Sequence, residues 1–156
     1  MAALFAQARD EGIDSPFRSL KPNCNGLQHT SARGSGLIYR VAVNRHGSRV
    51  VLTNTRSKWT GALAVLLEKR QAIDEAFAAA KLPQPLEWAE EVNAGRWVIR
   101  YRVDINYQDE PDRTKMRELN LASAQMKRVF DPYVRKLDPQ LEEDSSEASS
   151  DATEVP

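Results

Sequence analysis

The chain has little of several residue types, and each shortage excludes a class of protein. One cysteine, Cys24, occurs among the 156 residues, which excludes an internal disulfide framework and a zinc site built from several thiolates. The longest apolar run is too short to cross a bilayer, and Met1–Phe5 is soon followed by Arg9, Asp10 and Glu11. We therefore expect neither a membrane span nor a secretory signal, and predict a cytoplasmic protein.

Recognisable catalytic motifs are also missing. No Glu-x-Lys or Asp-x-Lys occurs, although a nuclease of the PD-(D/E)XK type needs such a pair to hold a divalent ion against the scissile phosphate. There is no Gly-x-Ser-x-Gly elbow, and His29 and His46 lack the helical spacing of zinc hydrolases. We predict a non-catalytic protein without metal or cofactor; an enzyme would need a site of unfamiliar type.

Charge is unevenly placed along the chain, although its formal sum is zero. All 22 Lys and Arg precede Asp138, and seven of the 22 acidic residues lie at or after it, so residues 1–137 carry about +7. The remainder is rich in Ser, Glu and Asp, a composition that does not offset the entropy of ordering. We predict a basic body and a disordered acidic tail over 138–156. The tail either competes with polyanions for the body or only keeps the protein soluble.

Hydrophobic periodicity predicts the elements of the first half. Residues 2–11 form one apolar helical face, giving a helical lead over 1–14. Gly, Pro and Asn residues favour a loop over 21–36. The alternation over 37–43 predicts a strand, which the turn residues 45–48 join to a second strand in an antiparallel hairpin.

The second half repeats this order after a helix. A period of 3.6 over 57–81 predicts one long amphipathic helix, with Ser57 as its N-cap. A strand follows at 86–88, and the strict alternation over 97–105 is the clearest strand signal in the sequence. The last helical stripe runs over 109–137, where proline at position 132 should interrupt or kink the helix.

These elements predict an α+β domain over residues 15–137. The order is β-β-α-β-β-α, a two-layer arrangement in which the helices cover one face of an antiparallel sheet. The other face of the sheet is left to solvent or to a partner.

Arginines are expected to gather on that other face. If Trp97 and its alternate neighbours point to the helices, strand parity puts five arginines on the opposite side. Those five are Arg96, Arg100, Arg102, Arg40 and Arg49. Guanidinium forks bind phosphate oxygens in a bidentate manner, so this face is a candidate nucleic-acid contact. The alternative is a solvated face neutralised by Glu87, Glu91 and Asp104.

A second anion site is conceivable in the Gly-rich segment 29–36. Arg33, Gly34 and Gly36 could together offer a guanidinium and backbone N–H groups to an anion. The Gly-Ser-Gly triplet lacks the following lysine of a phosphate-binding loop. An ordinary turn is the alternative.

Several short motifs resemble a known family. These are Gly34–Tyr39 (GSGLIY), Ile73–Phe77 (IDEAF), Pro85–Trp88 (PLEW) and Phe130–Pro132 (FDP). They resemble domain of unknown function 4268, over roughly residues 15–137. The resemblance implies a module that commonly follows a PD-(D/E)XK nuclease-like domain and works near nucleic acid, in defence or restriction. This chain lacks that nuclease domain, so no cleavage activity is expected.

The sequence therefore leaves two functions open. The first is a nucleic-acid-associated module that binds DNA or RNA through the basic sheet face, or assists a nuclease-type protein partner. The second is a protein-interaction or scaffold module that uses the exposed sheet face or an edge strand.

Overall fold

The computed structural model describes residues 2–22, 26–34, 36–44, 47–55, 58–92, 95–104 and 113–143. The elements are α1 (Ala2–Asp10), β1 (Leu27–Arg33), β2 (Leu37–Asn44), β3 (Gly47–Asn54), α2 (Ala62–Glu68), α3 (Arg70–Ala78), β4 (Glu87–Val92), β5 (Arg96–Val103), α4 (Arg113–Arg135) and the 3-10 helix η2 (Pro139–Glu142). The strands form one antiparallel sheet in the order β1-β2-β3-β5-β4. The predicted α+β class is confirmed.

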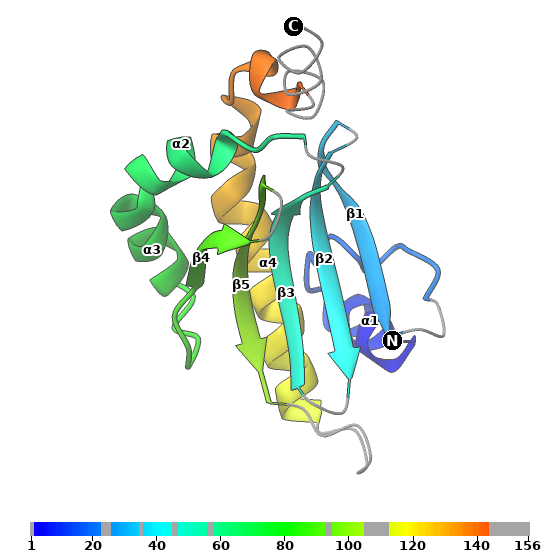
Figure 1. The fold of residues 1–156 in the computed structure, drawn as a ribbon. Coiled ribbons are helices and arrows are strands. Elements are labelled where there is room, and N and C mark those ends of the chain that lie inside the picture. Colours follow the sequence, from blue (N-terminus) through cyan, green and yellow to red (C-terminus); the bar gives the residue numbers. More distant parts are fainter. Residues whose placement is uncertain are drawn as a thin grey trace, which may run out of the picture.

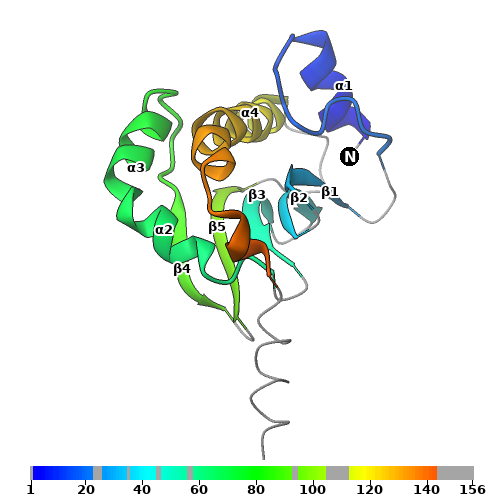
Figure 2. The ribbon, with the colours of Figure 1, turned by 90° about the horizontal axis from the view of Figure 1, so that it is seen from above.

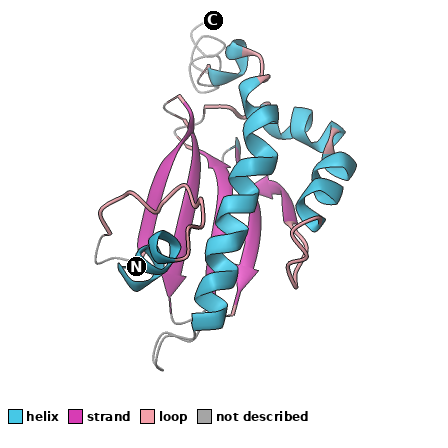
Figure 3. Cartoon of the chain, turned by 180° about the vertical axis from the view of Figure 1, so that it is seen from behind, coloured by secondary structure: helices cyan, strands magenta, loops and turns pink. Residues whose placement is uncertain are grey.

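The domain has two layers. Helix α4 lies behind the sheet in Figure 1 and in front of it in Figure 3, where the view is from the opposite side. The view from above shows α1, α3 and α4 on the same side of the strands (Figure 2), and α4 contacts α1, α3, β1, β3 and β5. Within the described residues, the other face of the sheet carries no helix.

Alternation along β5 builds the core. Trp97, Ile99, Tyr101 and Val103 are at most 3% exposed, whereas the residues between them are half-buried or exposed. Neighbouring strands follow the same parity, since Ile99 pairs with Leu52, which pairs with Tyr39. The predicted parity of this strand is confirmed, and Trp97 lies in the core as expected.

The segment 21–36 is not all loop, because residues 27–33 form the edge strand β1. The prediction was wrong there for a physical reason. The strand alternates between exposed and half-buried positions, and its core-facing positions include the polar residues Gln28 and Thr30. An edge strand with polar residues on both faces gives no apolar period of two, so composition alone favoured a loop.

The helix predicted over 57–81 is shorter and divided. It begins at Ala62, and Lys69 separates α2 from α3 with φ −104° and ψ 9°. Trp59 precedes α2 with a positive φ of 57° and is fully buried, so it does not belong to the helical stripe. The proposed N-cap, Ser57, lies outside the described residues.

Pro132 does not interrupt α4, although an interruption was one of the two outcomes predicted for it. The helix continues to Arg135, although a proline removes one backbone hydrogen bond and usually breaks a helix interior. Phe130 and Val134 are buried on either side of it. Asp131 accepts a hydrogen bond of 2.6 Å from the Tyr39 hydroxyl, instead of capping a new turn. These contacts hold the last turn despite the missing N–H group.

The first residues of the predicted disordered tail are ordered. Asp138 accepts from the N–H of Gln140 and caps η2, and Leu141 packs against the core. Residues 138–143 are therefore part of the folded domain. The rest of the predicted tail, 144–156, lies outside the described residues.

Trp97→Ala should lower the free energy of unfolding by about 3–5 kcal/mol, because it leaves a large cavity and removes the hydrogen bond from the indole N–H to the Trp59 carbonyl. Urea denaturation measures the change. The matched control is Arg49→Ala on the opposite sheet face, expected within about 0.5 kcal/mol of wild type. Equal effects of the two substitutions would contradict the assigned parity.

Candidate nucleic-acid interface

The open sheet face brings all five predicted arginines together. Because core-facing and outward positions alternate, the outward residues follow from the strand register. We call the surface formed by these residues the outer face. On β2, β3 and β5 it consists of Ile38, Arg40, Ala42, Arg49, Val51, Thr53, Arg96, Val98, Arg100 and Arg102.

The register sets the arginines against one another. Arg49 on β3 lies directly opposite Arg102 on β5. Arg40 on β2 and Arg100 on β5 pair with the same residue, Val51, from its two sides. Like charges directly opposite in a sheet destabilise the pairing, so carboxylates or an anionic ligand would stabilise this face.

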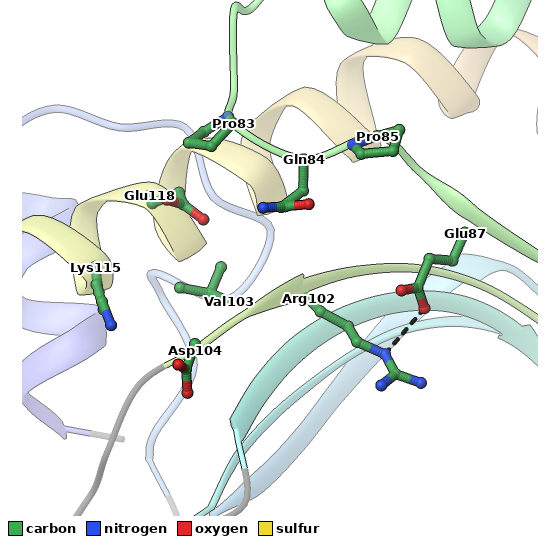
Figure 4. A pocket seen from close by; sticks show the side chains of 9 residues that line it. All are labelled: Pro83, Gln84, Pro85, Glu87, Arg102, Val103, Asp104, Lys115 and Glu118. Carbon is green, nitrogen blue, oxygen red and sulfur yellow. Dashed lines mark ion pairs between the residues drawn. The ribbon is translucent and has the colours of Figure 1, made fainter.

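Glu87 supplies a carboxylate to two of the five. Its Oε2 accepts from Nε of Arg100 at 2.6 Å and from Nε of Arg102 at 2.9 Å. The second of these pairs is marked in Figure 4. Both pairs are partly exposed, so they contribute little to stability. They do confirm one part of the neutralised-face alternative, in which Glu87 was expected to serve these arginines.

The other three form what we call the basic cluster: Arg40, Arg49 and Arg96. Among the side chains that the structure describes, no carboxylate forms an ion pair with any of them. The side chain of Glu91, one of the expected neutralising residues, is not among these. Burial, and then the charges of Arg96 and Arg49, lower the pKa of Arg40. The charges of Arg96 and Arg49 therefore act on Arg40, and none of the three has a neutralising partner among the side chains that the structure describes.

The floor of the outer face is apolar and closely covered. Ile38, Ala42 and Val51 are 7%, 4% and 4% exposed, and Thr53 is fully buried. The Thr53 hydroxyl donates to the Trp97 carbonyl at 2.7 Å. The accessible part of this face therefore consists mainly of the longer, charged side chains, not of an apolar patch.

Arg33 serves the fold instead of a loop that binds anions. Its Nη1 donates to the carbonyl oxygens of Val134 at 2.7 Å and Leu137 at 2.6 Å, near the end of α4. Its guanidinium also lies over the Trp59 ring, 5.1 Å from the centroid. A cation at a helix C-terminus satisfies carbonyls that have no intrahelical partner and complements the macrodipole.

The two glycines also have structural roles. Gly34 adopts a φ of +60° in the turn between β1 and β2, and its carbonyl accepts from the Ser31 hydroxyl at 2.8 Å. At Gly36, a Cβ would lie 2.6 Å from the Cβ of Lys58, so only glycine fits there. The geometry thus explains Arg33, Gly34 and Gly36 without an anion.

A hollow of about 430 Å³ lies at the edge of the outer face, where Glu87 and Arg102 are among the residues that line it (Figure 4). Glu118 on its wall accepts a hydrogen bond from the Tyr101 hydroxyl at 3.2 Å. Burial raises the pKa of Tyr101 to about 12; the Gln84 N–H opposes this rise and the Glu118 charge adds to it. The phenol therefore stays protonated at neutral pH. Its hydrogen bond occupies the Glu118 carboxylate on the wall of the hollow.

The described residues contain no group of three or more His, Cys, Asp or Glu that could hold a metal ion. In the same part of the chain, no helix is long and apolar enough to span a bilayer.

His29 lies on the outward side of β1, opposite Arg40. This position was missed because strand β1 was not predicted from the sequence. His46 and Cys24 lie outside the described residues.

Comparison with known proteins adds little. No family model matches the chain, and no curated protein matches it. It is similar to a chain of the heterodimeric ExoU–SpcU complex from the type III secretion system of Pseudomonas aeruginosa, with 16% identity, over 81% of this chain and 97% of that one. The TM-score is 0.30, at which the likeness carries no argument. The resemblance to domain of unknown function 4268 stays a prediction.

Arg33→Ala should lower the free energy of unfolding by about 2–3 kcal/mol, because it leaves carbonyls at the end of α4 without a charged donor. Arg33→Lys should recover part of the loss, since an ammonium keeps the charge but not the planar fork. Thermal and urea denaturation measure both. Lys136→Ala, an exposed change near the same helix end, is the control and should be nearly neutral. A fully stable Arg33→Ala protein would contradict the role assigned to Arg33.

Proposed function

We propose that this chain is a non-catalytic module that binds the phosphate backbone of nucleic acid through its outer face. The observation that carries the proposal is the basic cluster. Burial, and then the charges of Arg96 and Arg49, disfavour the charged form of Arg40. No carboxylate whose side chain the structure describes forms an ion pair with any of the three. A bound phosphate backbone supplies the missing negative charge.

The chemistry of the cluster suits phosphate. All the cations that the register places on this face are arginines, whose planar forks form two parallel hydrogen bonds with phosphate oxygens. The Arg guanidinium is also less strongly hydrated than the Lys ammonium, so its contact with a phosphate costs less hydration free energy. Backbone contacts of this kind position a protein on nucleic acid without reading its sequence.

We propose an order of importance among the five arginines that differs from the one the sequence favoured. The sequence favoured Arg96, Arg100 and Arg102 as principal contacts, with Arg40 and Arg49 in support. Because Glu87 holds Arg100 and Arg102, we assign the leading contacts to the basic cluster. Arg100 and Arg102 are secondary contacts at the edge of the outer face. When the ligand binds, Glu87 either stays paired with them or is displaced.

The biological setting in this proposal comes from the family resemblance. A module of this kind would act in the cytoplasm beside a nuclease-type protein partner, in defence or restriction. The partner would supply the cleavage chemistry, and this chain would supply affinity for the backbone.

A protein-interaction module is the second candidate. The observation that favours it is β1, an edge strand of the described sheet whose Leu27 side chain is 40% exposed. Edge strands can pair with an extended segment of another chain. Such a partner would be sensitive to changes in β1, not to changes in the basic cluster.

Replacing Arg40, Arg49 or Arg96 by Ala should weaken nucleic-acid binding several-fold at low salt and reduce the slope of log K against log salt by about one phosphate contact. Thermal stability should stay the same or rise slightly, since each change relieves repulsion. Fluorescence anisotropy with a short labelled duplex, measured between 20 and about 200 mM salt, tests this. A folded wild-type protein that binds no nucleic acid at low salt would end the proposal.

Glu87→Gln is the matched control with the opposite sign. It removes one negative charge from the same face and releases Arg100 and Arg102, so binding should tighten and the salt slope should steepen by about one to two contacts. Both pairs are exposed, so stability should change by less than about 1 kcal/mol. Unchanged binding by Glu87→Gln would show that this part of the face does not contact the ligand.

Truncation after Glu143 tests the competition expected from the acidic segment. The cut must spare η2, because Leu141 packs against the core. Removing residues 144–156 should tighten binding several-fold at low salt, an effect that fades as added salt shortens the screening length to about 10 Å and below. The melting temperature should not change. Equal affinity of the two proteins at every salt concentration would leave only a solubilising role for this segment.

A further inference from the structure

We infer that the outer face takes double-stranded nucleic acid in preference to single strands. The inference rests on the proposed function and names the ligand class of the same surface. Two properties of the face carry it: where the aromatic rings point, and how the cations are spread.

Every aromatic ring on the described parts of β2, β4 and β5 lies on the helix side. Tyr39, Trp97 and Tyr101 are at most 2% exposed and belong to the core. The Trp88 indole donates to Asp74 of α3, and its ring packs against Phe130 of α4. Among the described residues, the outer face therefore offers no Phe, Tyr or Trp ring on which an unpaired base can stack; the His29 imidazole, which lies at the β1 edge opposite Arg40, is the smallest ring that could serve. Proteins that hold single strands rely on such rings.

The cations cover an area and do not follow a line. The five arginines stand on three adjacent strands, β2, β3 and β5, which at about 4.8 Å per strand gives a width of roughly 10 Å. From Arg96 to Arg102 along β5, a rise of about 3.3 Å per residue gives a length of roughly 20 Å. An extended single strand needs a narrow basic groove that follows one backbone.

A duplex matches this footprint better. It presents phosphates from two backbones on one side, separated by a groove that is roughly 6 Å or 12 Å wide. A length of about 20 Å corresponds to about six base pairs at 3.4 Å each. Because the bases stay stacked inside the duplex, the missing aromatic platform has no cost for such a ligand.

The first test compares a 14-base-pair DNA duplex with each of its strands and with oligothymidine, using fluorescence anisotropy and the full-length protein at the same salt concentrations. The duplex should bind at least about tenfold more tightly than any single strand. Equal or tighter binding of the single strands would overturn this inference and leave the proposed function standing. No binding of either form would overturn the proposed function itself.

The second test adds an aromatic ring to the outer face. Val98 lies on the outer face between Arg96 and Arg100 along β5 and is half-buried, so Val98→Tyr puts a ring among the cations on a strand that tolerates aromatic residues. Affinity for oligothymidine should rise by about tenfold, while the duplex gains nothing. Val98→Ile is the control for size without a ring and should leave both affinities unchanged.

An acidic polypeptide and a second aromatic variant serve as controls for these tests. Poly-glutamate of matched charge should bind much more weakly than the duplex; equal binding would show that the face selects charge alone and would overturn the duplex inference. If Val98→Tyr lowers the melting temperature, Leu27→Tyr provides the same test, because Leu27 lies on the same side of the sheet, opposite Ala42, and is 40% exposed. Failure of both folded variants to gain affinity for single strands would show that ring placement does not decide the ligand class.

Discussion

The alternation of β5 is the constraint on which the rest of the structure depends. Trp97, Ile99 and Tyr101 fill the core because they stand two residues apart, and Arg96, Arg100 and Arg102 reach the other side for the same reason. Since β5 lies between β3 and β4, its parity is transmitted to both through the register. A slip of one residue would exchange the core and the charged surface together. The buried core and the basic outer face are therefore two consequences of one pattern.

The two faces also divide the energetic roles. On the helix side, polar groups are few and mostly satisfied: Asn54 is fully buried yet accepts from the Trp97 N–H and donates to the carbonyls of Lys58 and Gly95. On the outer side, charges of one sign are left near each other in the basic cluster. A domain whose core contributes most of its stability can tolerate such repulsion on one surface. That surplus charge is what a polyanionic ligand would use.

Strong periodicity predicted the parts of the fold that lie at its centre. Strands β2 and β5, the hairpin between β2 and β3, and the stripe of α4 all have apolar residues at the spacing that burial requires. Edge strand β1 was missed because its polar residues face both sides of the sheet. The division at Lys69 could not be predicted because the apolar stripe of the helix continues from α2 into α3 at the same spacing. That α4 continues through Pro132 could not be predicted, because Tyr39 and Arg33, which support its last turn, are distant in sequence.

Sequence parity also gathered the five arginines on one face, but it could not rank them. Ranking depends on which guanidinium groups Glu87 reaches, and side-chain reach across strands is not encoded in periodicity. Likewise, Arg33 resembled a candidate for anion binding until the end of α4 was placed beside it. A residue type and its spacing indicate what a side chain can bind, whereas its neighbours in space determine what it does bind.

The placement of β5 beside β3 has a consequence for the order of folding. Their pairing is long-range: the hydrogen bond from Thr53 to Trp97 joins residues 44 positions apart, and α1 meets α4 through Asn120 and Leu4, 116 positions apart. Contacts of such separation slow folding. The β1–β3 meander can form early during synthesis, but Arg49 and Arg40 then stand without Arg96, Arg100 or Arg102. A growing chain on the ribosome, surrounded by RNA, acquires its complete basic surface only after β5 has emerged and docked.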